Sequence, residues 1–186
     1  MEFTGKHRLV AHPDHPPRSV RSVEVRVLDG PEFVIRYAVE PATNLLLPNY
    51  PLVRRDKLWR STCFELFAKE AGAAAYREFN FAPANAWNAY SFSDWRKGMR
   101  QIGIDQPPNL VDCRIDDRQR ILPDRYELDV VIGRDLLAVG PGKASLTAII
   151  EERDGRMSYW ALAHPPGEPD FHHPACFTAT LPAIAP

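Results

Sequence analysis

The sequence has few of the features that mark nucleic-acid-binding, membrane-spanning or collagen-like proteins. Only 10 of its 186 residues are glycine, and 23 lysines and arginines stand against 24 aspartates and glutamates, which gives a net charge of −1. The two signs are interspersed, so they form no basic surface for nucleic acid or an anionic membrane. No apolar run approaches the roughly 20 residues that a membrane-spanning helix needs. We therefore expect neither nucleic acid nor a membrane as a partner.

Cysteine is scarce as well. The three cysteines, Cys63, Cys113 and Cys176, are odd in number, far apart and placed beside apolar residues, a pattern that favours reduced, buried thiols. Residues 1–8 carry several charges and no apolar segment follows them, so we expect no secretory signal. Both observations predict a cytoplasmic protein.

The motifs of common enzyme classes are also missing. The sequence has no Gly-rich phosphate loop ending in Lys-Ser or Lys-Thr and no dinucleotide-binding fingerprint. It has no Gly-x-Ser-x-Gly nucleophile elbow and no Cys-x-x-Cys zinc spacing. No spacing brings two carboxylates together by itself. We therefore expect a non-catalytic protein without a bound cofactor.

Proline, in contrast, is abundant: the 18 prolines are about 10% of the chain, roughly twice the usual share. Proline is excluded from helix interiors and central strands, so the proline-free windows locate the regular structure. Within them apolar residues recur mostly every second position, as Val23, Val25 and Val27 do, which is typical of half-buried strands. The pattern predicts about ten strands, at 23–27, 33–39, 62–67, 76–81, 87–92, 110–116, 126–132, 146–150, 157–162 and 176–181.

Short turns connect most of these strands. Hairpins are expected around Gly30, across 82–86 and at Asp154-Gly155, the strongest of the three signals. Residues 68–76 favour a turn over a helix, and 93–99 is predicted to be the one short helix. No repeat or linker divides the chain. We predict a single all-β domain over 1–186, a two-sheet antiparallel β-sandwich of immunoglobulin-like or jelly-roll type.

Two neighbouring predicted strands combine aromatic rings with carboxylates and amides. In the first, Glu65 shares a face with Cys63, and a carboxylate among apolar residues is either ion-paired or open to a cleft. In the first case Glu65 forms a structural ion pair, with Arg60 or Arg77 as its partner. In the second case Glu65 faces a cleft and accepts hydrogen bonds from a ligand. The second segment, 76–92, has the mixture of rings and amides that binds sugars, although alternating aromatics also fill the core of a sandwich.

Several stretches form a more specific combination. They are Leu58-Trp59-x-x-Thr62-Cys63-Phe64-Glu65-Leu66-Phe67, Tyr76-x-Glu78-Phe79-Asn80-Phe81-x-Pro83 with Trp87-x-x-Tyr90-x-Phe92, Tyr159-Trp160-Ala161-Leu162, and His164-Pro165-Pro166-Gly167-x-Pro169-Asp170-Phe171-His172-His173. In this combination, which spans nearly the whole chain, the sequence resembles the bacterial DOMON-like proteins, relatives of the family 9 carbohydrate-binding modules.

The resemblance implies a β-sandwich without catalytic activity, in a wider family that binds sugars or haem. In the sugar-binding modules a tryptophan six positions before a strand glutamate helps to form the site, and Trp59 and Glu65 stand at that spacing. A second aromatic, late in the chain, closes the site there, and Trp160 or Phe171 would take that part. Haem ligation in DOMON domains uses a Met and a His, and no matching pattern occurs here, so haem is not expected.

The segment 164–174 supports a different hypothesis. It holds His164, Asp170, His172 and His173, whose nitrogen and carboxylate donors suit zinc or a similar metal if the loop folds them inward. Their spacing matches no standard metal motif. The other interpretation is a loop braced by prolines whose histidines bond to backbone.

These observations predict a module that binds a small carbohydrate or a sugar derivative. Its cleft would be lined by Trp59, Glu65, Asn80, Trp87 and Trp160. The alternative is a metal-binding protein or metal-dependent enzyme that uses the histidine-containing loop. A protein partner docking on an edge strand or an aromatic face is a third possibility, and the sequence identifies no such partner.

Overall fold

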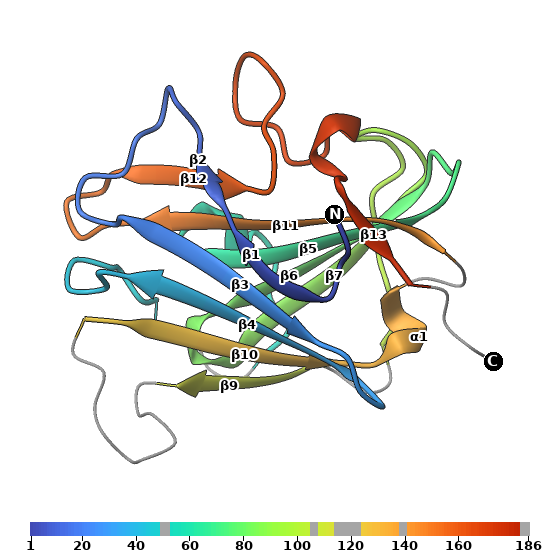
Figure 1. Ribbon diagram of the computed structural model, residues 1–186, viewed down its shortest axis with the longest axis horizontal. Helices are drawn as coiled ribbons and strands as arrows, with labels where there is room; N and C mark the ends of the chain where they lie inside the picture. Colours follow the sequence, from blue (N-terminus) through green and yellow to red (C-terminus); the bar gives the residue numbers. More distant parts are fainter. Residues whose placement is uncertain (49–52, 105–107, 114–123, 138–140, 183–186) are drawn as a thin grey trace.

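Two antiparallel β-sheets pack face to face in the computed structural model of the chain (Figure 1). The structure describes residues 1–48, 53–104, 108–113, 124–137 and 141–182. The smaller sheet has the order β1-β3-β4-β10-β9. Its strands are β1 (Gly5–Arg8), β3 (Ser22–Leu28), β4 (Phe33–Glu40), β10 (Tyr126–Ile132) and β9 (Asn109–Cys113).

The larger sheet has eight strands in the order β2-β12-β11-β5-β6-β7-β8, with β13 paired to the start of β11. These strands are β2 (Val10–Ala11), β12 (Met157–Ala161), β11 (Gly142–Glu151), β5 (Cys63–Glu70), β6 (Tyr76–Ala82), β7 (Ala86–Phe92), β8 (Arg100–Gln101) and β13 (Ala179–Leu181). The short helices are α1 (Arg134–Leu137) and the 3₁₀ turns η1 (Leu58–Arg60), η2 (Pro83–Asn85) and η3 (Pro174–Cys176). No helix in the described ranges is long and apolar enough to cross a membrane.

The predicted all-β sandwich is confirmed, and each of the ten predicted strands overlaps an observed one. The predicted hairpins are present as the antiparallel pairs β3–β4, β6–β7 and β11–β12. β5 is central, between β11 and β6, as its two apolar faces predict. The sequence missed β1, β2 and β8, which have only four, two and two residues. Positions 114–116 of one predicted strand lie outside the described residues.

The helix predicted at 93–99 is wrong. The segment is a tight turn in which the Ser93 amide donates to the Lys97 carbonyl and the Lys97 amide donates to the Asp94 carbonyl. Arg96 and Gly98 have positive φ angles of 54° and 65°, which a right-handed helix cannot include. The one α-helix among the described residues is α1, which the sequence did not predict.

Alternation along the strands of the larger sheet separates two environments. One face packs against the smaller sheet and supplies apolar side chains to the main core, among them Phe64, Leu66, Phe79 and Phe81. Tyr37, from the smaller sheet, donates a 2.8 Å hydrogen bond across this core to the Glu65 carbonyl oxygen. The sandwich core is therefore completed without the residues of the sheet's outer face.

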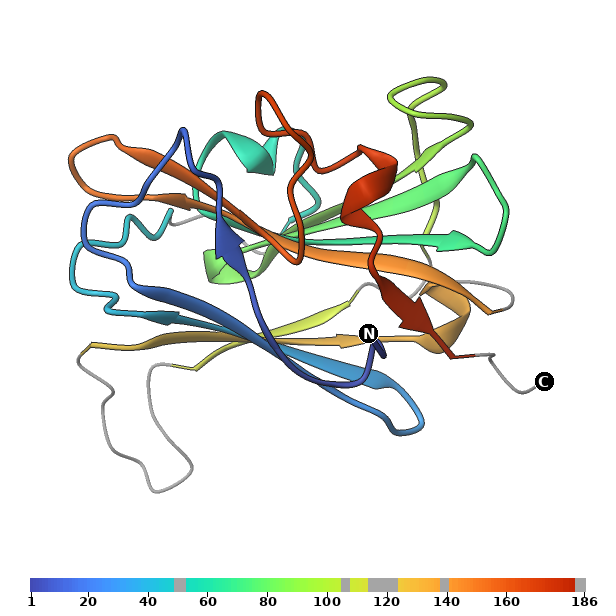
Figure 2. The ribbon, with the colours of Figure 1, turned by 45° about the horizontal axis from the view of Figure 1, so that its top comes forward.

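The outer face of the larger sheet carries the alternate residues, including Glu65 and Phe67 of β5. Figure 2, with this sheet above, shows η1 and the orange-red segment that follows β12 lying over that face. The turn at 93–99 contributes residues to the same region. These segments convert an exposed sheet face into a partly covered site.

Candidate functional site

A cavity of about 320 Å³ lies between the outer face of the larger sheet and the segments that cover it. Its lining is mostly aromatic and apolar, with four polar side chains. The rings include Trp59 of η1, Phe67 of β5, Phe92 of β7, Tyr159 of β12 and Phe171. The polar side chains are Glu65, Glu78, Arg96 and His172. An apolar pocket with a few convergent polar groups is the usual form of a small-molecule site.

Strand register places two carboxyl groups together on the floor of this cavity. Glu65 of β5 pairs with Asn80 of β6, and Phe67 pairs with Glu78, so Glu65 and Glu78 are diagonal neighbours on one face. Such neighbours lie within reach of long side chains. Glu65 is 3% exposed and Glu78 is 4% exposed, which is rare for carboxyl groups without a cationic partner.

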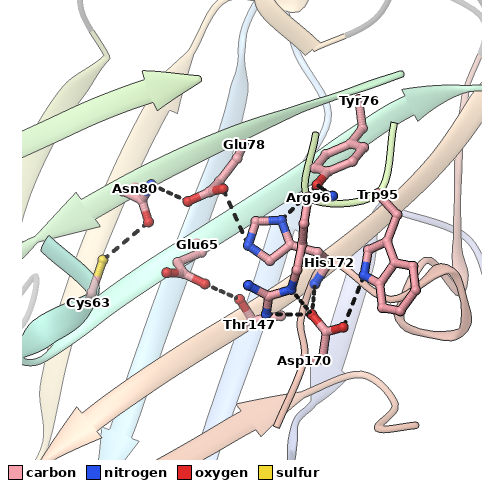
Figure 3. Close-up of polar contacts among 10 residues, drawn as sticks. All are labelled: Cys63, Glu65, Tyr76, Glu78, Asn80, Trp95, Arg96, Thr147, Asp170 and His172. Atoms are coloured by element: carbon pink, nitrogen blue, oxygen red, sulfur yellow. Dashed lines mark hydrogen bonds and ion pairs between the residues drawn. The ribbon is translucent and has the colours of Figure 1, made fainter. Parts of the chain in front are cut away.

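Each carboxyl group has a neutral hydrogen-bond donor (Figure 3). Thr147 Oγ1 donates to Glu65 Oε2 at 3.0 Å, from the position opposite Glu65 on β11. Asn80 Nδ2 donates to Glu78 Oε1 at 2.7 Å, and the Cys63 thiol lies 3.6 Å from Asn80 Oδ1. The floor of the cavity is therefore a small polar layer surrounded by aromatic side chains.

The ion pair considered from the sequence is not formed. No salt bridge joins Glu65 to Arg60 or Arg77 among the described residues. Arg77 instead donates to the backbone carbonyls of Asp135 and Leu136, at 3.3 and 2.8 Å. Glu65 instead lines the cavity without a cationic partner among the described residues.

Burial raises the pKa of both acids. Burial, followed by the proximity of Glu78, raises the pKa of Glu65 well above its usual range, and the bond from Thr147 opposes this only in part. Burial raises the pKa of Glu78 to about 7, against the effects of the Asn80 bond and the Arg96 charge. Two like charges in a shared, poorly solvated site disfavour double ionisation, so the pair retains at least one proton near neutral pH.

His172 faces Glu78 as a neutral ring. The Arg96 amide donates to Tyr76 Oη at 3.2 Å, so the Tyr76 hydroxyl hydrogen is free to reach His172 Nδ1 at 2.8 Å. This network assigns the remaining ring hydrogen to Nε2, which lies 3.8 Å from Glu78 Oε2. Burial and the Arg96 charge lower the pKa of His172 to about 4, although Asp170 acts in the opposite sense. At neutral pH this contact is therefore not an ion pair.

Asp170 connects the two loops at the rim of the cavity. Arg96 donates to its Oδ1 from Nε at 3.1 Å and from Nη2 at 2.7 Å, and the His172 amide donates to the same oxygen at 3.1 Å. Trp95 Nε1 donates to Oδ2 at 3.0 Å. These bonds fix the turn at 93–99 against the segment after β12, and they compensate the charge of Arg96.

The predicted ligand-binding residues fall into separate groups. Trp59 and Glu65 line the cavity, and Asn80 lies beneath it, bonded to Glu78. Trp87 and Trp160 belong to the main sandwich core on the opposite face of the sheet, where they are 7% and 4% exposed.

Each of these two tryptophans has a structural partner in place of a ligand. The guanidinium of Arg54 lies 5.0 Å over the ring of Trp87, and Trp160 Nε1 donates to Ser158 Oγ at 3.0 Å. Of the two late aromatics considered for closing the site, Phe171 lines the cavity and Trp160 does not.

The four candidate metal ligands have different partners. His164 Nε2 bonds to the Val10 carbonyl oxygen at 2.8 Å, and His173 Nδ1 accepts from the Ala175 amide at 3.1 Å at the start of η3. Asp170 is occupied by Arg96 and Trp95, and His172 by Tyr76. Among the described residues no group of three or more metal-ligating side chains comes together. The loop thus has the form of its second interpretation, with two histidines bonded to backbone.

The cavity residues that were not predicted include Glu78, Arg96 and Tyr159, and His172 was predicted only as a candidate metal ligand. A signal existed for Glu78, because alternation places it on one face with Asn80 and opposite Phe79. What the sequence does not supply is the register that sets this face beside Glu65. Arg96 and His172 lie in irregular segments, where periodicity carries no information.

Comparison with known proteins supports the fold. Models of known protein families give no match, and neither do the curated proteins. Among solved structures, the chain is similar to the crystal structure of a "putative carbohydrate-binding protein" from Bacteroides uniformis, with 17% identity and a TM-score of 0.64 over 96% of this chain and 85% of that one. At this level of identity the similarity establishes a shared β-sandwich fold.

Proposed function

We propose that this protein is a non-catalytic binding module that holds a small carbohydrate in the cavity on the outer face of the larger sheet. The observation that carries the proposal is that Trp59 and Glu65 line one cavity together with Tyr159 and Phe171. Aromatic rings cover the apolar C–H faces of a sugar, and carboxyl oxygens accept hydrogen bonds from its hydroxyl groups.

The volume of the cavity favours a single sugar unit over a polymer as its ligand. A volume of about 320 Å³ is at the low end of the range for small-molecule pockets. The rings of Trp59 and Phe171 come from two covering segments, while Glu65 and Glu78 project from the sheet below them. A single sugar ring, or a sugar-bearing metabolite with one ring inserted, suits this arrangement.

Two further points agree with the proposal. The similar structure from Bacteroides uniformis bears a carbohydrate-binding description, and the sequence resembles DOMON-like proteins and their relatives among the carbohydrate-binding modules. In the sugar-binding modules to which the sequence bears this resemblance, a tryptophan and a glutamate six positions apart form part of the sugar site. Trp59 and Glu65 stand at that spacing in this chain.

Intrinsic fluorescence tests the proposal, because Trp59 is the one tryptophan among the cavity-lining residues. A panel of monosaccharides and sugar phosphates should include one that changes the tryptophan emission in a saturable way. Trp59→Ala should abolish that response. Leu28→Ala is the matched control, since Leu28 is an exposed apolar residue on β3 of the other sheet, 47% accessible, and its loss should leave the response unchanged.

If no sugar perturbs the emission at millimolar concentration, or if Trp59→Ala responds like the unaltered protein, the proposal fails. Circular dichroism of Trp59→Ala separates loss of binding from loss of folding. We expect the variant to fold, because Trp59 is only partly buried and lies outside the main core.

A further inference from the structure

The floor of the cavity holds two carboxyl groups that form no ion pair at neutral pH with any side chain of the described residues. Glu65 receives a single side-chain hydrogen bond in the described part of the chain, from Thr147 to Oε2, so its Oε1 has no partner. Glu78 Oε2 has only the 3.8 Å contact to His172. Both side chains are more than nine-tenths buried and line the cavity, so one oxygen of each is available to a ligand.

The one cation among the described lining residues is already committed. Arg96 donates from Nε and Nη2 to Asp170 Oδ1 at the rim, and its charge acts on Glu78 only from a distance. His172 is neutral near pH 7 because burial lowers its pKa to about 4. What remains is a pair of carboxyl groups whose full ionisation requires a positive charge from outside the protein.

We propose that the sugar taken by this cavity carries a free amine, held as an ammonium group between Glu65 and Glu78. The inference rests on the function proposed above and narrows it to amino sugars or amine-bearing sugar derivatives. An ammonium group has three donors and a positive charge, so it can satisfy both free carboxylate oxygens and offset one of the two negative charges. A hydroxyl group supplies one donor and leaves the repulsion in place.

The aromatic surround suits the same ligand. Trp59, Tyr159, Phe92 and Phe171 line the cavity around the carboxyl groups. The face of an aromatic ring attracts a cation within about 6 Å of its centroid, and the attraction grows when water is excluded. The rings can therefore receive both the C–H surface of the sugar and part of the ammonium charge.

Ligand entry is coupled to proton release. The pair holds at least one proton without ligand, and an ammonium group between the acids displaces it. The other titratable or charged groups near the pair are Cys63, Tyr76, Tyr90 and Tyr159 on the larger sheet, Tyr37 across the core, and Arg96, Asp170 and His172 on the covering segments. Burial raises the pKa of Cys63 well above its usual value and that of Tyr76 to about 12, so both stay protonated near neutral pH.

The pH dependence follows with a definite sign. Affinity for an amino sugar should fall in acid, where protonation of Glu65 and Glu78 removes their negative charge, and again in base, where the sugar's own amine loses its proton. The result is a bell-shaped profile. Affinity for a neutral sugar should lack the alkaline fall.

Isothermal titration calorimetry near pH 7 with glucosamine, N-acetylglucosamine and glucose tests the proposal. We expect glucosamine to bind at least about tenfold more tightly than glucose, a factor equal to about 1.4 kcal/mol. Titrations in two buffers of different ionisation enthalpy should reveal proton release with glucosamine and none with glucose. Galactosamine against galactose repeats the comparison for a second ring configuration.

Substitutions test whether Glu65 and Glu78 cause the preference for glucosamine over glucose. Glu65→Gln and Glu78→Gln keep the side-chain shape and should each bring the affinities for glucosamine and glucose to within a few-fold of each other. Glu70→Gln, an exposed position at the end of β5, is the matched control and should keep the full preference. The wild-type pH profile gives an independent result should either variant fold poorly.

The outcomes separate this inference from the proposed function. Equal binding of glucosamine and glucose overturns the amine inference and leaves sugar binding intact. Binding of 1,4-diaminobutane without binding of any sugar overturns both, because the cavity then takes a simple amine. Absence of binding by every compound also overturns both.

Discussion

Replacing Glu78 by glutamine should make the protein more stable at alkaline pH and leave its stability almost unchanged in acid. Folding raises the pKa of Glu78 from its ordinary value of 4.5 to about 7, chiefly through burial. The folded state therefore binds a proton that the unfolded state has released between these values. Stability falls as pH rises through this window and stays low above it.

The magnitude follows from the shift. One pKa unit corresponds to about 1.36 kcal/mol, so a rise from 4.5 to about 7 costs the folded protein about 3 kcal/mol above the window. Glutamine accepts the same hydrogen bond from Asn80 and carries no ionisable group. The stability difference between Glu78→Gln and wild type should therefore grow by up to about 3 kcal/mol between pH 4.5 and about pH 8.

Urea denaturation monitored by circular dichroism over this pH range measures the difference directly. Glu70→Gln should show a nearly constant difference of less than about 0.5 kcal/mol, as surface substitutions usually do. The reasoning is refuted if the difference between Glu78→Gln and wild type does not change with pH. It is also refuted if the variant loses stability as pH rises.

Three other predictions follow from the same structure. Trp160→Ala should lower the free energy of unfolding in urea by about 3–5 kcal/mol, because Trp160 is a core residue. The ligand-induced change in Trp59 fluorescence should persist in the folded fraction of this variant. Loss of that change in folded protein would place Trp160 at the site. Asp170→Asn should weaken ligand binding and lower the free energy of unfolding in urea by about 1–2 kcal/mol, since it disrupts the charged contact with Arg96. Unchanged ligand binding would mean that the rim does not shape the cavity. In the Cys113→Ser variant, Cys63 and Cys176 should resist a thiol reagent while the protein is folded and react with it once the protein is unfolded. Both thiols are buried, and burial raises their pKa. Rapid labelling of the folded variant would contradict this.

The architecture was predictable because the strands obey a period of two and proline marks their ends. The alternation of Val23, Val25 and Val27 reports burial on one side only, and the Asp154-Gly155 turn sets a hairpin locally. The turn at 93–99 misled the prediction because Ser93 and Gly98 resemble helix ends, while the positive φ angles between them arise from the closed turn.

The site was predictable only in part, for a reason specific to sheets. Trp59 and Glu65 came from a spacing within one segment, and both line the cavity. Trp87 lies on a strand that is buried on both faces, and the strand of Trp160 is buried on one face and half-buried on the other, so composition alone does not distinguish the core face from the cavity face. That distinction depends on register, which only the pairing of the strands supplies.

Saturation-transfer difference NMR shows directly whether the cavity lined by Trp59 and Glu65 binds a sugar ring. Irradiation of the protein in the presence of a mixture of monosaccharides and amino sugars should transfer saturation to the C–H protons of at least one sugar, through its contact with the rings. The transfer should disappear in Trp59→Ala and persist in Leu28→Ala. Transfer to no sugar, or equal transfer in wild type and Trp59→Ala, would contradict the proposed function.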